Sequence, residues 1–359
     1  MGNGVYDAVL LVSFGGPEGP DDVMPFLENV LRGRNVPRER MLEVAEHYHH
    51  FGGVSPINAQ TRELIAALHR QLAEHGLHLP IYWGNRNWHP LLPETIRQMA
   101  EQGVRRALAY VTSAYSSYSG CRQYRENIEA ARDEVGSRAP AIDKLRVFYN
   151  HPSFIETLTD RVQQALNQVP VERRGSARVL FTAHSIPAAM AQTCRYEQQL
   201  VETCRLITEQ LGHGQARLVY QSRSGPPSQP WLEPDVCDAI RELHRAGSTR
   251  DVVIAPVGFL TDHLEVLYDL DVQAKELCES LGIGMVRAGT SGTHPRFVQM
   301  IRELIVERIS EQPERLALGN LGPSHDVCPA DCCQYSPRPS RPLVSRPAQC
   351  ADERLEKRS

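Results

Sequence analysis

The chain has 359 residues, of which 41% are hydrophobic and 23% charged, and its formal net charge is −4. That length corresponds to about two domains, and the hydrophobic content suffices for an ordinary globular core. A weakly acidic chain lacks the basic face of a dedicated nucleic-acid-binding protein. None of its apolar runs approaches the ~20 residues that a membrane-spanning helix needs.

The first residues, MGNGVYDAVLLVSFGG, contain no basic segment, and their apolar stretch from Ala8 to Val12 is too short for a signal peptide. We therefore expect a cytoplasmic protein whose nine cysteines stay mostly reduced. In that compartment, cysteines that cluster in the sequence are more often metal ligands than disulfide partners.

Apolar strand-like runs alternate with helical patterns along the chain, which is typical of a parallel sheet covered by helices on both faces. The expected strands are 8–14, 81–84, 106–112, 178–183, 218–221, 251–257 and 284–287, and helices are expected at 59–74 and 91–102. The alternation stops after about Glu311. The stretch from Ser336 to Pro347 is rich in Pro, Ser and Arg, a composition that cannot build a packed core.

The two halves of the chain resemble each other. Residues 92–117 predict a helix, a glycine stop and a strand that ends in a polar loop, and residues 233–262 repeat that order. We therefore expect two Rossmann-like, doubly wound α/β domains, 5–170 and 171–312, followed by a cysteine-containing, partly disordered tail, 313–359. Ligands of such sheets bind beyond the carboxyl ends of the strands, so the loops there are the places to search.

His184 falls at the carboxyl end of the expected strand 178–183, where a doubly wound sheet places functional groups. A satisfied core histidine is an equally good interpretation of this stretch alone. Pro187 suits the first turn of the helix that follows.

The segment 251–271 predicts a strand, a turn at Gly258 and a helix capped by Thr261. Asp262, Glu265 and Asp269 then lie at i, i+3 and i+7, which places three carboxylates on one helix face. Acidic residues are ordinary near a helix N-terminus, so a solvated face is the simpler interpretation. With His263 beside them, the same carboxylates suit a divalent cation such as ferrous iron.

Three further segments are candidates for a ligand site. The serines and tyrosines of 110–124 follow a strand and could line a flat, partly apolar pocket, or else form a surface loop. Ser55 stands just before a helix, where a purely structural N-cap would explain it. Arg32, Arg34, Arg38 and Arg40 could pair with ligand carboxylates, although a lone basic run is usually a solvated face.

The tail contains the tightest cysteine group, CPADCC, with Cys328, Cys332 and Cys333. Three thiols in so short a span suggest a metal or iron–sulfur site. A fourth ligand is required, for which Cys121, Cys350 and a helical cysteine are all candidates. Inert thiols on a flexible tail are the alternative.

Taken together, these segments resemble the ferrochelatase family over nearly all of residues 5–310. The motifs that carry the resemblance occur in the family's order and spacing. They are LLVSFGGPEGP at 10–20, FGGVSPIN at 51–58, TAHSIP at 182–187, YQSRSGPPSQPWLEP at 220–234 and GFLTDHLEVLYDLD at 258–271. Their joint presence leaves little room for coincidence.

The resemblance implies two Rossmann-like domains that enclose a porphyrin cleft, and a metal chelatase of the lyase class acting in haem biosynthesis. It implies that His184 and Glu265 bind the substrate Fe²⁺, with His263 as a third catalytic residue and Asp262 and Asp269 behind them. Ser55, Tyr124 and Trp231 would contact or pack near the porphyrin.

Two features depart from the family's pattern. Many bacterial relatives have Tyr at the position of Phe14, where it can ligate iron in the product, and Phe14 cannot. One branch carries a 2Fe–2S cluster on three tail cysteines and one internal cysteine, and CPADCC resembles that tail. The position equivalent to the usual internal ligand is Thr157, which leaves the fourth ligand open.

The motifs are similar to those of high-GC Gram-positive members, which generally use coproporphyrin III. Arg32 and Arg34 would suit its additional propionates, and the next haem-pathway enzyme would then be a partner. Protoporphyrin IX is the alternative substrate.

A cobalt chelatase for sirohydrochlorin fits less well, because such chains are usually shorter and place more than one His at the metal. A non-catalytic haem or iron carrier would keep its function without Glu265. The oligomeric state is not determined by the sequence.

Overall fold

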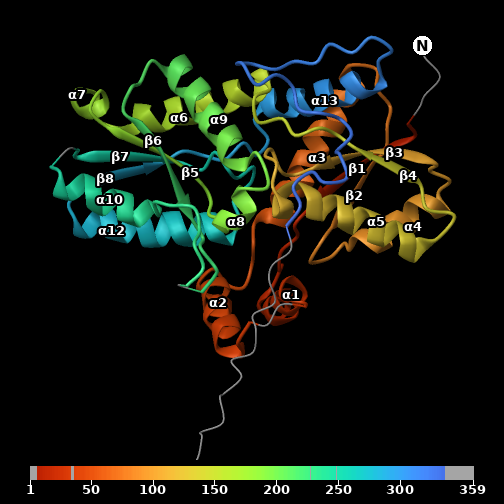
Figure 1. Cartoon of the computed structure of the whole chain (residues 1–359), viewed down its shortest axis with the longest axis horizontal. Coiled ribbons are helices and arrows are strands. Elements are labelled where there is room, and N and C mark those ends of the chain that lie inside the picture. Colours follow the sequence, from red (N-terminus) through yellow and green to blue (C-terminus); the bar gives the residue numbers. More distant parts are fainter. Residues whose placement is uncertain (1–5, 34–35, 227, 248, 336–359) are drawn as a thin grey trace, which may run out of the picture.

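A computed structural model of the protein describes residues 6–33, 36–226, 228–247 and 249–335. It contains two parallel four-stranded sheets, one in each half of the chain (Figure 1). The first sheet has the order β2-β1-β3-β4 and the second the order β6-β5-β7-β8. The strands are β1 Ala8–Ser13, β2 Ile81–Asn85, β3 Arg106–Val111, β4 Ala141–Lys144, β5 Arg178–His184, β6 Ala216–Gln221, β7 Asp251–Ala255 and β8 Gly284–Arg287. The predicted doubly wound fold is confirmed.

Each expected strand is found with bounds that differ by no more than two residues at either end. All residues of β1 and β7 are buried, as a parallel strand covered on both faces requires. The strand that the sequence did not predict is β4. It is short, lies at the edge of its sheet and includes Asp143 and Lys144, so it lacks the apolar run that identifies the others.

Helices connect the strands and cover both sheets. They are α1 Val23–Val30, α2 Arg38–His50, α3 Ile57–Glu74, α4 Leu92–Glu101, α5 Gln123–Val135, α6 Pro152–Gln168, α7 Val171–Arg174, α8 Ala188–Ala191, α9 Tyr196–Leu211, α10 Val236–Arg245, α11 Leu264–Val266, α12 Lys275–Ser280 and α13 Pro295–Ile309. A short 3-10 helix spans Pro20–Asp22, and two π-helices, η2 Tyr118–Arg122 and η3 Leu267–Ala274, precede α5 and α12.

The two sheets also agree in register. Val9 of β1 lies between Ile81 of β2 and Leu108 of β3, the first and third residues of those strands. Val179 of β5 is placed in the same way between the first residue of β6 and the third of β7. Each residue of β1 therefore corresponds to the residue 170 positions later in β5. By the same offset, Phe14, directly after β1, corresponds to His184.

The halves share a core rather than standing apart. Helix α6 contacts β7 and β8 of the second sheet, although it precedes that sheet in the chain. Helix α13 returns to pack against α3 and α6. Because these exchanged helices bury apolar side chains of both halves in one cluster, the two sheets are held against each other. The domain bounds 5–170 and 171–312 stay a prediction.

Helices α1 and α2 project together from the first half, below both sheets in the view of Figure 1. They have a small apolar cluster of their own around Phe26, to which Phe14, Tyr48 and Trp88 contribute rings. In the described part of the chain, no helix is both long and apolar enough to cross a membrane.

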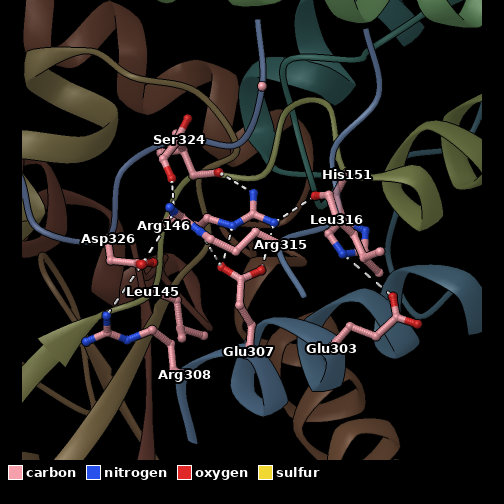
Figure 2. A network of polar contacts seen from close by, with 12 residues as sticks. Leu145, Arg146, His151, Glu303, Glu307, Arg308, Arg315, Leu316, Ser324 and Asp326 are labelled. Carbon is pink, nitrogen blue, oxygen red and sulfur yellow. Dashed lines mark hydrogen bonds and ion pairs between the residues drawn. The ribbon is translucent and has the colours of Figure 1, made fainter. Parts of the chain in front are cut away.

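The first part of the tail is attached to the body by a buried polar network (Figure 2). Arg146, which follows β4, forms a two-pronged ion pair with Glu307 of α13, with nitrogen–oxygen distances of 2.8 and 3.0 Å. Their side chains are only 1% and 5% exposed. Arg146 also donates to the Leu316 carbonyl at 2.8 Å, and Arg315 contacts Glu307 at 3.4 Å and Asp326 at 3.3 Å. Residues 313–335 therefore have a defined path, while the stretch from Ser336 to Pro347 lies outside the described residues.

Candidate metal-insertion site

His184 is the last residue of β5 and lies at the carboxyl edge of the second sheet. Its Nδ1 is hydrogen-bonded to the Ser185 carbonyl, and the Tyr196 hydroxyl donates to the His184 carbonyl at 3.0 Å. A carbonyl can only accept, so Nδ1 carries the proton in the neutral ring and Nε2 presents a lone pair. The backbone of the strand thus fixes both the position and the tautomer of this histidine.

Glu265 comes from the segment that follows β7. His263 caps α11, because its Nδ1 accepts the Glu265 backbone N–H at 3.2 Å. The expectation that Thr261 caps this helix is therefore wrong. The chain between Ala255 and Leu264 is a loop in which Thr261 is buried, and the helix begins two residues after the expected start.

The two residues predicted to bind iron lie together. His184 Nε2 is 3.6 Å from Glu265 Oε2, and His263 Nδ1 is 3.9 Å from the same oxygen. The side chains of His184 and Glu265 are 32% and 47% exposed, so the gap between them is open to an incoming ion. This is a nitrogen and oxygen ligand set of the kind that suits ferrous iron.

His184, Glu265 and His263 shift one another's pKa values through their charges. Burial works to lower the pKa of His184, but the Glu265 charge and hydrogen bond outweigh it and hold that pKa above its ordinary value. Burial would raise the pKa of Glu265, yet the charge and hydrogen bond of His184 lower it to about 2. Burial lowers the pKa of His263 despite the nearby Glu265. The pair therefore carries a carboxylate opposite a basic imidazole.

Asp269 lies one helical turn behind Glu265, in the π-helix η3. Its carboxylate accepts hydrogen bonds from the Ser222 hydroxyl and, at 3.4 Å, from Gln221 Nε2. Burial raises the pKa of Asp269 to about 6, with the Ser222 bond opposing and the Glu265 charge adding to the shift. A carboxyl that titrates near neutrality can take up and release protons under working conditions.

The predicted stripe of three carboxylates is only partly correct. Asp262 precedes α11 and pairs with Arg287 at 3.1 Å, and Arg287 also binds Asp271 at 2.6 Å. Because His263 caps the helix, Asp262 lies outside it and the i, i+3, i+7 spacing does not apply. Arg287 was not predicted as a site residue, because its ion pairs with Asp262 and Asp271 depend on how β8 lies beside β7.

An aromatic group lies at the corresponding edge of the first sheet. The Arg86 guanidinium lies 5.7 Å from the ring centre of Phe14 and 4.4 Å from the ring centre of Tyr124. Tyr124, a predicted porphyrin contact on α5, is itself almost fully buried. Helix α2 extends towards His184 and Glu265. Burial, and then the charge of Glu265, raise the pKa of Tyr48 on this helix. Its neighbour His47 stacks on Tyr268 of η3 at 3.7 Å between ring centres.

Tyr48, His47 and Arg86 were not singled out from the sequence. They stand in a helix just before the motif at 51–58 and in a strand-end loop, outside the motifs themselves, and only their approach to Glu265, Tyr268 and Phe14 marks them.

The remaining predicted substrate contacts are dispersed. Ser55 is buried beside Gly16, its backbone N–H donates to the Pro17 carbonyl, and it is not the N-cap of α3. Trp231 pairs with Pro187, in the loop after His184, and packs on Gly225. Arg32 is exposed after α1 and donates to Asn29 Oδ1. Arg34 lies outside the described residues.

The tail thiols form a second group of potential metal ligands, which we call the thiol cluster: His325, Cys328, Cys332 and Cys333. The ligand atoms of His325, Cys328 and Cys332 all lie within 4.8 Å of one another. Cys332 Sγ is 3.6 Å from Cys333 Sγ. Every cysteine of the described chain is a free thiol.

Comparison with known proteins places the chain in one family. The family model described as Ferrochelatase matches residues 6–309. A protein of Rhodopirellula baltica named Ferrochelatase is 60% identical over 96% of this chain and 98% of its own. Proteins named coproporphyrin III ferrochelatase are 50% identical in Streptomyces coelicolor, over 93% of this chain and 95% of theirs, and 49% identical in Nocardia farcinica, over 93% and 98%.

Among solved structures, SirB from Bacillus subtilis with Fe³⁺ aligns with a TM-score of 0.53 and 12% identity, over 85% of this chain and 97% of its own. A multi-domain protein of Deinococcus radiodurans with structural similarity to chelatases gives a TM-score of 0.52 and 13% identity, over 84% of this chain and 55% of its own. At these identities the likeness concerns the fold alone.

Proposed function

The chain belongs to the ferrochelatase family, and from that premise we propose that it inserts Fe²⁺ into coproporphyrin III in haem biosynthesis. The observation that carries the proposal is the approach of His184 Nε2 to Glu265 Oε2 at the carboxyl edge of the second sheet. The predicted family is confirmed by the match over residues 6–309. The roles of the individual site residues below are proposals.

The reaction exchanges two pyrrole protons for one ferrous ion, so the site must supply a base and hold a cation. With Nδ1 donating to the Ser185 carbonyl, Nε2 of neutral His184 is free to accept a proton or bind iron. The Glu265 carboxylate neutralises charge on the incoming ion. Insertion changes no oxidation state, and therefore no nicotinamide or flavin is required.

Released protons need a route out of the site. Asp269 stands behind Glu265 and titrates near neutrality, and Ser222 and Gln221 connect it to the surface loop that follows β6. We assign to Asp269 the relay of protons from the His184–Glu265 pair, and to His263 the positioning of Glu265 through the cap of α11.

A porphyrin is flat and largely apolar, so its ring needs aromatic surfaces as well as charged groups at its rim. The proposed ring site lies between the aromatic group of Phe14, Tyr48 and Trp88 on one side and the His184–Glu265 pair on the other. A rigid wall on each side can hold the ring bent, so that the nitrogen lone pairs point at the metal.

The choice of coproporphyrin III over protoporphyrin IX is supported by two considerations. Several relatives at about half identity over nearly their whole length carry the coproporphyrin name. Arg32 is exposed just after α1 and bonded only locally, to Asn29, so it could pair with one of the four propionates that this substrate carries. The more similar Rhodopirellula baltica protein carries a name without a substrate, so the assay must decide.

The test is anaerobic metallation with ferrous iron, with the two porphyrins compared under identical conditions. A higher kcat/KM for coproporphyrin III is the expected result. A preference for protoporphyrin IX would keep the chemistry and overturn the substrate assignment. If neither porphyrin turned over while iron porphyrin bound tightly, the protein would be a carrier.

We also propose a 2Fe–2S cluster on Cys328, Cys332 and Cys333. The donor set fits, because such clusters are bound by cysteine thiolates and these three converge at the tail. When bound, the cluster supplies a one-electron redox centre, which the insertion reaction itself does not use. Eight free thiols in the described chain favour a reducing compartment, and we therefore place the enzyme in the cytoplasm. There, an enzyme that decarboxylates the iron coproporphyrin would accept this product.

A further inference from the structure

Cys121 lies in the π-helix η2, nearly two hundred residues from the tail in sequence, yet its neighbour Arg122 donates to the Cys332 carbonyl of the thiol cluster. We infer that Cys121 is the fourth thiolate of the tail metal site, and that the metal fastens the tail to the first half of the molecule. This inference rests on the proposed cluster and names the ligand that the three tail cysteines lack.

The thiols fall into two close pairs. Cys121 belongs to the buried cluster against which Cys328 packs, and Cys328 is the largest influence lowering the pKa of Cys121. Cys332 Sγ and Cys333 Sγ are 3.6 Å apart. Cys328 and Cys332 in turn lie within 4.8 Å of each other. A 2Fe–2S cluster requires four cysteine ligands, and this arrangement supplies four thiols in one place.

The tail is held in this position by its backbone, independently of any metal. Arg122, the neighbour of Cys121, donates to the Ala330 carbonyl at 2.8 Å and the Cys332 carbonyl at 3.0 Å. Arg125 donates to the Cys328 carbonyl at 3.4 Å. Because the same short segment carries Cys121 and binds the tail carbonyls, the register between the two segments is determined before a metal arrives.

The surroundings suit thiolates. Cys121 and Cys333 are 5% and 4% exposed, so a bound group would be shielded from solvent. The positive charges of Lys144 and Arg125 act to lower the pKa of Cys121, and the charge of Lys144 also acts on Cys328. Positive groups stabilise the deprotonated sulfur that metals require. Earlier in the tail, Arg315 and Asp326 belong to the polar network around Glu307, which brings the segment to this place (Figure 2).

Other candidates for the fourth ligand fit less well. Thr157, at the position of the family's usual internal cysteine, is buried in α6, and its hydroxyl is engaged by the Ser153 carbonyl and His294. Cys194 interacts electrostatically with Cys121 and Cys332, but its thiol donates to carbonyls of its own segment, Met190 and Ala191. Cys350 lies outside the described residues. His325 Nε2 is 3.7 Å from Cys332, and its use in place of Cys121 would favour zinc over an iron–sulfur cluster.

The experiment uses the full chain, purified anaerobically as wild type, Cys121→Ser, Cys194→Ser and Cys237→Ser. Iron, zinc and acid-labile sulfide are measured per chain, together with visible absorption, and circular dichroism confirms folding. Wild type is expected to contain about two irons and two sulfides per chain. Cys121→Ser should lose most of the sulfide and the visible bands, while Cys194→Ser and the distant control Cys237→Ser should keep them.

A second readout tests the fastening of the tail. Limited proteolysis should cleave Cys121→Ser after α13 several times faster than wild type and the two control variants. Full sulfide retention in folded Cys121→Ser, loss confined to Cys194→Ser, or a wild type with one zinc and no sulfide would each overturn the inference. Porphyrin metallation is assayed separately, because acid-labile sulfide does not come from substrate iron. A loss of chelatase activity is thereby distinguished from a loss of the cluster.

Discussion

The two sheets have the same strand order and the same register, yet their equivalent edges carry different chemistry. Phe14 and His184 stand at matching positions, as do Arg86 and Gln221 on the neighbouring strands. The first edge presents rings and a guanidinium, and the second presents an imidazole that faces a carboxylate. In the proposed function, the side chains at one repeated position therefore distinguish the sheet edge that packs the ring from the edge that receives the metal.

The same comparison extends to the segments after β3 and β7. Each leads into a π-helix, a form that often occurs at functional sites. The one after β7 follows Glu265 and contains Asp269, in a partly open site suited to an ion that must come and go. The one after β3 contains Cys121, buried against the tail and suited to an ion that stays. In the two proposals, the substrate metal thus occupies the more exposed site and the resident metal the buried one.

The largest effect is expected when the His184 imidazole, which distinguishes the second sheet edge from the first, is removed. His184→Ala should lower kcat for iron insertion by at least about 100-fold, the usual scale for a lost general base, because Nε2 of His184 is the group proposed to accept the pyrrole proton. Porphyrin should still bind, as measured by fluorescence quenching. His69→Ala, on the exposed face of α3, is the control. Turnover that survived in His184→Ala would remove this residue from the mechanism.

The next largest effect concerns the carboxylate opposite. Glu265→Gln removes the charge and hydrogen bond that hold the pKa of His184 above its ordinary value, and leaves the burial that lowers it. His184 acts in its neutral form, so a lower pKa keeps it active to lower pH. We expect reduced kcat, with the acidic limb of the kcat/KM profile shifted to lower pH. If the acidic limb of the kcat/KM profile did not shift, Glu265 would not control the pKa of His184.

Phe14→Tyr tests the difference between the two edges in the opposite direction, because it adds a potential iron ligand to the aromatic edge of the first sheet. The added hydroxyl would lie on the ring side of the strand end, where it could coordinate iron in the product. Insertion should persist, while release of the iron porphyrin becomes several-fold slower and the product's visible spectrum shifts. A spectrum identical to that of wild type would mean that the Phe14 ring does not face the metal.

The smallest effect is expected at Gln221, the counterpart of Arg86. Its amide donates to the Glu265 carbonyl at 3.0 Å, and Gln221→Ala removes that bond. A net hydrogen-bond contribution of about 1 kcal/mol corresponds to a loss of roughly fivefold in kcat/KM if the bond positions Glu265. Steady-state kinetics measure it, and thermal unfolding separates positioning from stability. A change in stability with unaltered kinetics would assign Gln221 a structural role only.

By itself, the sequence determined the alternation of strands and helices, the internal repeat and the segments that carry the site. Apolar runs identify buried parallel strands, and His184 and Glu265 stand out because they follow two of them. The edge strand β4 was missed because its four residues, Ala141–Lys144, are half polar. The Thr261 cap was wrong because a histidine two residues later caps the same helix.

Contacts between distant segments were decided only by the tertiary structure. Arg287 draws Asp262 away from Glu265, Arg86 packs over Phe14 and Tyr124, and α2 brings Tyr48 towards the carboxylate. These partners lie on different elements, and no local spacing encodes their distance. Cys121 belonged to a set of open alternatives for the same reason. Its nearness to Cys328 depends on the path of the tail, and the buried pair of Arg146 and Glu307, with the tail groups bound to it, determines that path.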